Sequence, residues 1–485
     1  MAVLDFEPKE VFYYFEEICG IPHGSSHTEL ISNYLVNFAR EHGLKFIQEE
    51  CGNVIIFKEA SKGYENAPTL ILQGHMDMVC EKDEEADIDF LKDGLELQVK
   101  DDHIFANHTT LGGDDGIAVA YILAILASTD SEDGIRHPAL EAVFTVDEEI
   151  GMLGATALDA SVLKGSMLLN IDSEEEGILT TSCAGGVVGE VTLPFHPVEV
   201  EGVCYELLID GLKGGHSGVE IHKERGNANI LMGRLLFEIS EQMGFGISAI
   251  SGGLKDNAIP RAARAEIWLD EENQAVLKEV AEKFEKTIRN EYRASDSDVT
   301  VRVQKQEDAQ GIMIHPREKE MLIYILRNFP NGVQKMSMDI PGLVETSCNL
   351  GIVKTLEDSV QLQVSIRSSV ESEKRSLSDK IRYLTEFLGC DYKESGDYAG
   401  WEYDPDSKLQ KIMIEVYEKM YGEQPKVEAV HAGLECGILS SKLPGLQCIS
   451  IGPDILDIHT PKERLSISST KRVWEYVKAV LSEIK

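Results

Sequence analysis

Residues 69–78 read TLILQGHMDM, and this stretch decides the fold. Its first half, Thr69–Gln73, is a continuous apolar run that ends at a glycine, which is typical of a strand buried on both faces of a sheet. His75 and Asp77 follow directly, and residues two apart in an extended chain share a face. Because ligands bind at the carboxyl edge of open α/β sheets, we expect both side chains to lie at a ligand site.

The segments around this strand alternate between helical and strand patterns. Residues 29–42 place apolar side chains at helical spacing, and residues 116–128 form a helix rich in Ala, Ile and Leu. Further strands are predicted at 53–58, 142–146 and 167–171. This alternation predicts an α/β fold with a mostly parallel sheet.

A second pattern begins after about residue 186, and the first pattern returns near residue 397. We therefore expect one domain in two segments, 1–186 and 397–485, with an α+β domain inserted at 187–396. Its helix at 271–291 should begin at the N-cap Asp270. The expected order of strands and helices occurs twice in the inserted domain, which indicates a duplication, although the two halves share no evident sequence identity.

The chain is strongly acidic. Its 485 residues include 84 Asp and Glu against 46 Lys and Arg, for a formal net charge of −38. This length allows two to four domains at roughly 100–200 residues each. No basic stripe suits nucleic acid or an anionic membrane surface, and no run of about 18 apolar residues predicts a membrane span. The N-terminus does not resemble a signal peptide.

The cysteines indicate the compartment. Nine are scattered along the chain without a CxxC pair. An odd number in a long chain favours reduced thiols in the cytosol over a disulfide framework or a thiolate zinc site.

Four further segments carry acidic or histidine side chains at the ends of predicted strands or in the loops that follow. They read LGGDDG (111–116), VDEEIG (146–151), LLNIDSE (168–174), and IGP and IHT (451–453 and 458–460). Taken singly, most have an ordinary explanation, such as an acidic helix cap or a solvated loop. Three consecutive acids after an apolar strand, however, are costly to bury unless a cation compensates them.

Taken together, these segments predict a metal site. Two histidines and several carboxylates form a nitrogen and oxygen ligand set that suits zinc, with manganese or cobalt as alternatives. A site for two ions needs a bridging carboxylate and two end ligands for each ion, and the five segments supply them. The sequence contains no GxSxG, phosphate-loop or HExxH motif that would indicate another chemistry.

The same segments resemble the metal-site motifs of a known family. The phrases LQGHMDMVCEK, TTLGGDDGIAVA, FTVDEEIGMLGA, NIDSEEEG and HAGLECG are similar to those of the M20 metallopeptidases. The resemblance is closest to the branch of aminoacyl-histidine dipeptidases, also called cytosolic non-specific dipeptidases, and runs from about residue 10 to the end. It implies a zinc-peptidase catalytic domain with an inserted lid domain.

The resemblance also implies a ligand set for two zinc ions per subunit. His75, Asp114 and Asp172 would bind one ion, and Asp114, Glu149 and His459 would bind the other. Asp114 would then bridge the two ions.

Further roles follow from the same resemblance. Asp77 would orient His75, and Glu148 would act as general base on a hydroxide that bridges the metals. The peptide bond from the bridging aspartate to Asp115 would be cis. His216, from the inserted domain, would stabilise the oxyanion of the transition state.

The substrate of a dipeptidase presents a free carboxylate and a free amine. Arg367 is the candidate for the carboxylate, because the guanidinium fork matches its geometry. Asn257 would donate to the substrate backbone, His431 would lie near the metals, and Glu435 would hold the amine.

The resemblance implies a metal-dependent dipeptidase of the cytoplasm that hydrolyses unblocked dipeptides, including those that end in histidine. A homodimer formed through the inserted domain is expected. A tripeptidase or an amidohydrolase of N-acyl amino acids is the alternative within the family. A metal-dependent scaffold without catalysis is the alternative outside it, although all five expected ligands and Glu148 are present.

Overall fold

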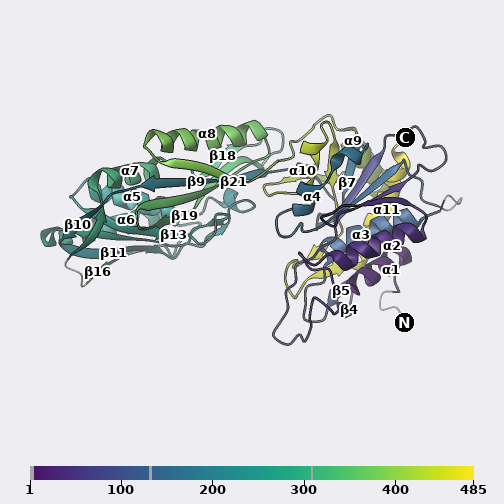
Figure 1. Cartoon of the computed structure of the whole chain (residues 1–485), viewed down its shortest axis with the longest axis horizontal. Coiled ribbons are helices and arrows are strands. Elements are labelled where there is room, and N and C mark those ends of the chain that lie inside the picture. Colours follow the sequence, from purple (N-terminus) through teal and green to yellow (C-terminus); the bar gives the residue numbers. More distant parts are fainter. Residues whose placement is uncertain (1–4, 130–133, 307–309) are drawn as a thin grey trace. The chain divides into compact units, whose positions relative to one another are not determined.

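The computed structural model describes residues 5–129, 134–306 and 310–485. The described chain divides into two compact units. The first unit takes its residues from Met1–Ser182, Tyr403–Ala429 and Leu434–Lys485, and the second from Cys183–Glu402 and Val430–Gly433. Figure 1 shows both units coloured along the sequence.

The first unit is built on an eight-stranded sheet in the order β1-β2-β6-β3-β7-β23-β8-β22. In that order the strands are Lys45–Gln48, Val54–Lys58, Leu140–Thr145, Leu70–His75, Met167–Asn170, Gln447–Ser450, Ile178–Cys183 and Lys426–Val430. The central strands β6, β3, β7 and β23 run parallel, whereas β1, β2 and β8 pair antiparallel with their neighbours. The carboxyl ends of the four parallel strands therefore meet at one edge of the sheet, as predicted from the sequence.

Helices cover both faces of this sheet. They are α1 (Lys9–Cys19), α2 (Glu29–Glu41), α3 (Gly113–Ala127), α4 (Leu153–Ala157), α9 (Lys408–Tyr421), α10 (Glu435–Lys442) and α11 (Ile467–Glu483), with a 3-10 turn η1 (Ala160–Val162). The completely buried Leu70 and Leu72 belong to one apolar core with α1, α3, α9 and α11. Ile71 between them faces the opposite layer, where it contacts Gly165.

A small four-stranded sheet completes the first unit. Its order is β24-β25-β5-β4, which are Ile455–Leu456, Arg464–Ser466, His103–Ala106 and Leu97–Lys100. The antiparallel pairing of β25 with β5 joins the C-terminal segment to the segment that precedes α3. Leu465 belongs to β25, and the side chain of Ser466 caps α11.

The second unit contains a nine-stranded sheet in the order β16-β11-β15-β13-β19-β20-β9-β21, with β18 paired to β19. In that order these are Thr300–Lys305, Val203–Asp210, Ala263–Leu269, Gly246–Gly252, Val344–Thr355, Ser359–Ser368, Gly185–Pro194, Asp391–Tyr398 and Gly332–Met336. The remaining strands pair as β10 (Pro197–Glu201) with β17 (Gln310–Ile314), and β12 (Gly215–His216) with β14 (Ala258–Ile259).

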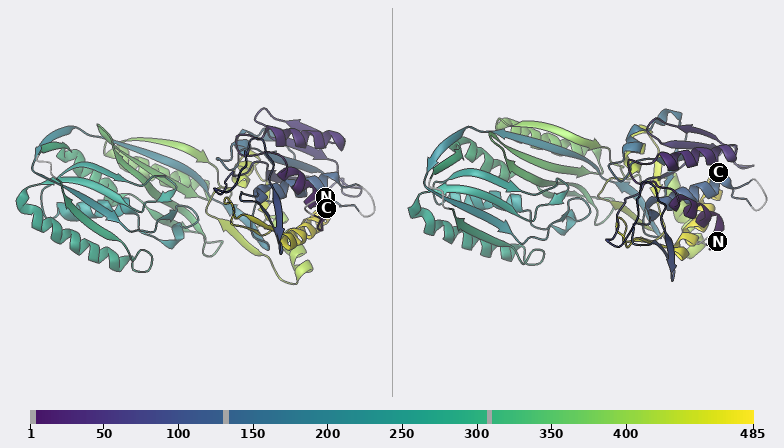
Figure 2. Two further views of the ribbon diagram at one scale, coloured as in Figure 1. Left: turned by 90° about the horizontal axis from the view of Figure 1, so that it is seen from below. Right: turned by 60° about the horizontal axis from the view of Figure 1, so that its bottom comes forward.

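Helices pack on this sheet in a second layer, which can be followed in Figure 2. They are α5 (Ala228–Ser240), α6 (Gln274–Glu291), α7 (Pro316–Asn328) and α8 (Glu371–Phe387), with 3-10 turns η2 (Ile221–Lys223) and η3 (Glu271–Asn273). Buried and exposed positions alternate over residues 263–267 of β15, as expected for a sheet covered on one face. The predicted cap at Asp270 is wrong: it precedes η3, its side chain makes no capping bond, and α6 begins at Gln274.

The sheet of the second unit consists of two halves with the same topology. In the first half, β11, α5, β13, β15, α6 and β16 follow one another as β-α-β-β-α-β. In the second half, β9, α7, β19, β20, α8 and β21 give the same succession. Numbered within each half, the strands lie in the order 4-1-3-2, and the halves join where β13 pairs with β19. The first half is nested in the second, because β9 precedes it in the chain.

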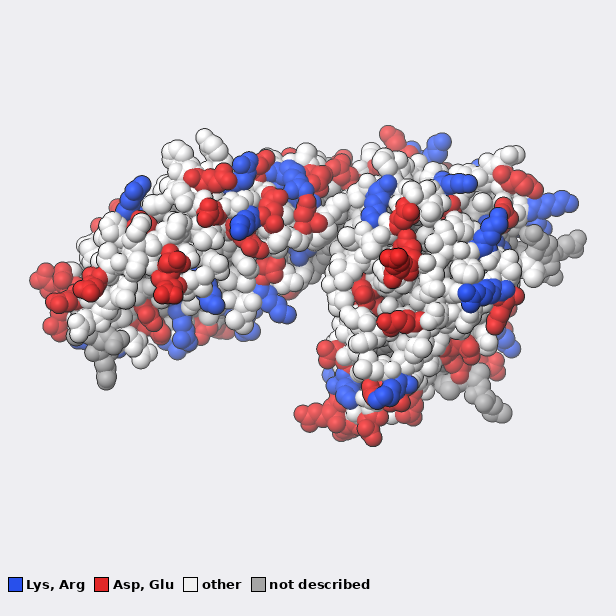
Figure 3. All heavy atoms as spheres, viewed as in Figure 1, with Lys and Arg blue, Asp and Glu red and all other residues white. Residues whose placement is uncertain are grey.

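Acidic side chains are spread over both units on the face shown in Figure 3, with basic ones between them. Seven of the nine cysteines are buried. Among the described residues, no helix is long and apolar enough to cross a membrane.

Replacing a buried leucine of the second unit should destabilise the fold far more than replacing an exposed one. Leu277 of α6 is completely buried, whereas Leu254 is 95% exposed. We expect Leu277→Ala to lower the free energy of unfolding by about 2–5 kcal/mol, because it leaves a cavity. Leu254→Ala should stay within about 0.5 kcal/mol of the parent. Denaturant unfolding measures both, and equal losses would contradict the assigned core.

Candidate metal centre

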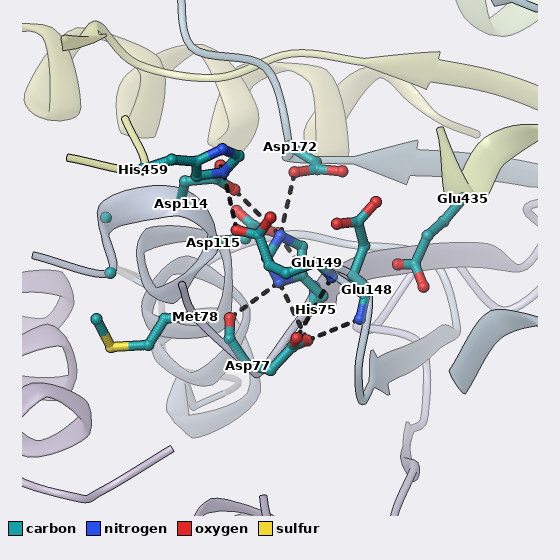
Figure 4. A network of polar contacts seen from close by, with 12 residues as sticks. His75, Asp77, Met78, Asp114, Asp115, Glu148, Glu149, Asp172, Glu435 and His459 are labelled. Atoms are coloured by element: carbon teal, nitrogen blue, oxygen red, sulfur yellow. Dashed lines mark hydrogen bonds and ion pairs between the residues drawn. The ribbon is translucent and has the colours of Figure 1, made fainter. Parts of the chain in front are cut away.

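The expected metal ligands meet at the carboxyl edge of the first unit's sheet (Figure 4). His75 is the last residue of β3, and Glu148 and Glu149 lie in the loop after β6. Asp172 follows β7, and Asp114 lies in the first turn of α3. The adjacent ends of three parallel strands therefore supply most of the cluster.

The first group of ligand atoms surrounds His75. Its Nε2 lies 3.1 Å from Oδ1 of Asp114 and 3.5 Å from Oδ1 of Asp172. One potential ligand atom from each of the three residues falls within 4.8 Å of the others. This spacing suits a single ion held by three side chains.

The second group shares Asp114 with the first. Nε2 of His459 lies 3.1 Å from Oδ2 of Asp114 and 3.0 Å from Oε1 of Glu149. The three residues again meet the 4.8 Å spacing. Because the two oxygens of Asp114 face different histidines, this carboxylate lies where a bridging ligand would. The peptide bond between Asp114 and Asp115 is cis, which confirms that part of the expectation.

Asp77 makes different contacts from those expected for orienting the histidine alone. Nδ1 of His75 lies 3.0 Å from the main-chain oxygen of Asp77 and 3.5 Å from its carboxylate. That carboxylate accepts the N–H groups of Glu148 and Glu149, at 3.0 and 3.4 Å, and the hydroxyl of Ser25 at 2.8 Å. Asp77 thus joins the end of β3 to the loop that carries the acidic pair. Ser25 lies in no motif from which this contact could have been predicted.

Asp115 also binds the carboxyl end of β3. It is buried, and its Oδ2 accepts the N–H of His75 at 3.1 Å. A Cβ at Gly74 would lie 2.7 Å from that oxygen and 2.6 Å from Cβ of Ala118, so this close approach requires glycine. Sequence reasoning did not assign Asp115 a contact, although its place beside the bridging aspartate was a usable signal.

The electrostatics show an excess of buried negative charge. Burial opposes protonation of His75, but hydrogen bonds with three surrounding aspartates outweigh it and hold its pKa well above the ordinary value. Hydrogen bonds with Asp114 and Glu149 raise the pKa of His459 to about 10. Burial, followed by repulsion from nearby carboxylates such as Asp172, raises the pKa of Glu148 to about 9.

Among the described residues, the two histidines are the only cationic groups within 4.0 Å of these carboxylates. Side chains with such a surplus of charge need further cations to stay buried together. Two divalent ions would supply that charge and would favour ionised carboxylates and neutral imidazoles. The donor set therefore fits a two-ion metal centre.

Glu435 belongs to the first unit and is completely buried. Its Oε2 accepts hydrogen bonds from Nε2 of Gln73 at 2.5 Å and from the hydroxyl of Thr145 at 2.7 Å, while Oε1 has no partner. Burial raises the pKa of Glu435 to about 7. In Figure 4 its side chain lies beside that of Glu148.

The other expected substrate residues lie in the second unit. Arg367 of β20 is buried, donates from Nη1 to the hydroxyl of Tyr398 at 2.9 Å, and leaves Nε without a partner. Nε2 of His431 lies 2.7 Å from the hydroxyl of Ser347. Burial, then repulsion from Arg367, lowers the pKa of His431 to about 3. Neither Tyr398 nor Ser347 lies in a recognisable sequence motif, so these contacts could not be predicted from the sequence.

His216 and Asn257 are held by neighbouring strands of the same unit. His216 lies opposite Ala258 in the pairing of β12 with β14, and the N–H of Ser217 donates to the main-chain oxygen of Asn257. Burial, then repulsion from Arg367, lowers the pKa of His216. Asn257 itself is exposed. The second unit thus brings together a guanidinium and two neutral imidazoles.

Three overlapping groups of histidine and carboxylate side chains in this cluster could each hold a metal ion. The family model described as Peptidase family M20/M25/M40 matches residues 71–483. The chain belongs to this peptidase family.

Individual relatives agree with this membership. The cytosol non-specific dipeptidase of Escherichia coli (strain K12) is 34% identical over 479 residues, which cover 98% of each chain. The solved structure of aminoacylhistidine dipeptidase from Vibrio alginolyticus is 36% identical, with a TM-score of 0.94 over 100% of this chain and 98% of that one. Aminopeptidase PepT from Bacillus cereus ATCC 10987 shares the fold at 15% identity, with a TM-score of 0.58 over 99% of both chains.

Zinc binding by the metal-free protein should strengthen between about pH 6 and about pH 8 and should release protons. The pKa of His459 is raised to about 10, so its imidazole carries a proton over this range, whereas a metal binds only the neutral ring. The pKa of His75 is raised as well, by its hydrogen bonds with surrounding aspartates. Calorimetry in two buffers with different ionisation enthalpies measures the released protons. Binding that releases none would contradict the ligand assignment.

Proposed function

We propose that this chain is a two-zinc dipeptidase of the cytoplasm that hydrolyses unblocked dipeptides, including those with a C-terminal histidine. The observation that carries the proposal is the pair of three-residue ligand groups that share Asp114. The chain is a metal-dependent peptide hydrolase by family, and full-length homologues at 34% and 36% identity are named as dipeptidases, which supports this substrate class.

His75, Asp114 and Asp172 would hold one ion, and Asp114, Glu149 and His459 the other. Imidazole and carboxylate ligands suit Zn²⁺, and Mn²⁺ or Co²⁺ would be accepted by the same donors. Bound there, such ions polarise the scissile carbonyl and make a water molecule more acidic.

Glu148 is the proposed general base. Its main-chain N–H is fixed by Asp77, and its carboxyl group lies beside Asp172 and Glu435. It would take a proton from the attacking water and deliver it to the leaving amine. The cations would lower its raised pKa and so make the ionised form available.

Different residues would recognise the two ends of the substrate. Arg367, with its unpartnered Nε, would receive the substrate carboxylate, and Asn257 would donate to the substrate backbone. His216 would stabilise the developing oxyanion, with His431 beside it. Glu435, whose Oε1 is buried without a partner, would attract the free amine.

We also propose a homodimer formed through the second unit. Tyr324 of α7 and Tyr383 and Phe387 of α8 line one surface hollow of about 510 Å³. These three aromatic side chains are 50%, 75% and 81% exposed. Apolar patches of this kind on a water-soluble surface mark interaction sites, and a second copy would cover this one with its own aromatic residues. The printed name of the Escherichia coli relative supports a cytoplasmic location.

Release of amino acids from a small substrate panel tests the function. The panel holds an Xaa-His dipeptide, other dipeptides, a tripeptide and an N-acetyl amino acid. We expect zinc-dependent cleavage of the dipeptides, with kcat reduced about 10²- to 10⁴-fold in Glu148→Gln because proton transfer is lost. Metal content should be unchanged in this variant, since Glu148 is outside both proposed ligand groups.

Other results of this assay separate the alternatives. Preference for the tripeptide would make the chain a tripeptidase of this family, and preference for the N-acetyl amino acid would make it an amidohydrolase of N-acyl amino acids. Absence of any cleavage by protein that demonstrably holds metal would overturn the enzymatic proposal. Glu65→Gln is a suitable control, because this exposed residue lies outside the assigned site and should retain full activity.

The dimer is tested by Phe387→Glu. A charge at the centre of an apolar contact costs binding free energy because it must be desolvated, so we expect the variant to become monomeric. Leu254→Glu serves as control, since Leu254 is even more exposed than Phe387 but lies outside the patch. Sedimentation velocity measures the mass of each. A Phe387→Glu dimer as stable as the parent would place the interface elsewhere.

A further inference from the structure

Glu463 has a buried carboxylate that accepts four consecutive main-chain N–H groups. Only 2% of the residue is exposed. Oε2 accepts from Leu111 at 2.8 Å and Gly112 at 3.2 Å, and Oε1 accepts from Gly113 at 2.8 Å and Asp114 at 3.3 Å. Among the described residues, no lysine, arginine or histidine lies within ion-pair distance of this carboxylate. Its partners are therefore the main-chain donors of one turn.

These four donors belong to the turn that leads into α3. The first N–H groups of a helix have no partner inside it, and the positive end of the helix dipole favours an anion. Gly112, at the N-cap, has a φ of +65° and makes no side-chain capping bond, so Glu463 caps the helix from a distant part of the chain. Asp114 departs from helical geometry, with φ −85° and ψ 103°. The helical ladder alone therefore does not fix its main chain.

The main chain of Glu463 belongs to the segment that carries His459. The N–H of Glu463 donates to the main-chain oxygen of Thr460 at 3.0 Å, and the Thr460 hydroxyl donates to the main-chain oxygen of Asp457 at 2.7 Å. Arg464, the next residue, begins β25 and donates to the Asp457 carboxylate at 2.6 Å. These bonds close the segment into a compact loop, so a shift of Glu463 would move His459 as well.

We propose that Glu463 is a positioning residue for the metal centre: its carboxylate fixes the main chain of Asp114 relative to His459. This inference rests on the proposed two-ion function. Glu463 touches neither substrate nor metal in this role. It joins the shared ligand of both groups to an end ligand of the second, so its loss would weaken both sites together. The distance of 3.1 Å between His459 Nε2 and Asp114 Oδ2 is the geometry that it would maintain.

The test compares Glu463→Gln with a matched variant, Glu141→Gln. Glutamine keeps the size of the side chain but replaces one acceptor oxygen by an NH₂ group, which cannot accept a main-chain N–H. Glu141 is also buried, and it accepts the N–H groups of Lys164 and Gly165 at 2.9–3.0 Å. It lies near the start of β6, at the opposite end of the strand from the acidic pair. Both variants lose the same kind of bond.

Zn²⁺ affinity, measured in competition with a chromophoric chelator, separates the two variants. We expect wild type and Glu141→Gln to bind two ions per chain with affinities within about twofold, and Glu463→Gln to bind both about 10- to 100-fold more weakly. Saturating Zn²⁺ should raise the melting temperature of Glu463→Gln less than that of the other two proteins. Excess Zn²⁺ should restore kcat towards the wild-type value, with KM for the dipeptide unchanged.

Each outcome decides the inference. Equal Zn²⁺ affinity in Glu463→Gln and Glu141→Gln overturns it, because the loss would then be a general effect of removing a buried acceptor. Should Glu463→Gln not fold, Glu463→Asp replaces it. That variant keeps the charge but shortens the reach, and wild-type Zn²⁺ affinity in it would equally overturn the inference. Fewer than two ions in wild type would instead contradict the proposed function itself.

Discussion

Mutual repulsion among carboxylates at one sheet edge is the constraint on which the rest of the structure depends. Asp114, Glu149 and Asp172 converge with Glu148 on one site. In the part of the chain that the structure describes, two imidazoles are the only groups there that offer compensating charge. Bringing them together requires parallel strands whose ends align, and it requires main-chain bonds that oppose their separation. Asp77, Asp115 and Glu463 serve the second requirement, since each uses its own carboxylate to hold N–H groups of the ligand-bearing segments. The site thus contains two kinds of acidic side chain. Some are possible metal ligands, and the others accept main-chain N–H groups.

The second unit presents the complementary chemistry. Arg367 is buried beside imidazoles whose pKa values are lowered by burial and by its charge. Neutral histidines can donate or accept a hydrogen bond without adding charge, while the guanidinium of Arg367 retains its positive charge. The first unit therefore gathers carboxylates with two histidines, and the second gathers a guanidinium with two further histidines.

The sequence predicted the parts of this arrangement that follow from local patterns. The apolar runs of β3, β6 and β7 end at His75, Thr145 and Asn170, close to the predicted positions, because buried parallel strands have an unmistakable composition. The strands β8, β9 and β22 were missed, since glycines and polar residues weaken their pattern. The contacts of Glu463 could not be predicted from the sequence either. Its partners lie about 350 residues away, and no spacing in a sequence encodes such a contact.

The position of β23 has a consequence for the order of synthesis. This strand lies between β7 and β8 in the sheet, yet it is translated after the whole second unit. Until the ribosome has produced it, the edges of β7 and β8 have no partner at that place, and unpaired edges invite pairing with other chains. The first unit therefore cannot complete its sheet while the second is being made. Nascent chains should be most prone to aggregation, and most dependent on chaperones, during exactly that interval of translation.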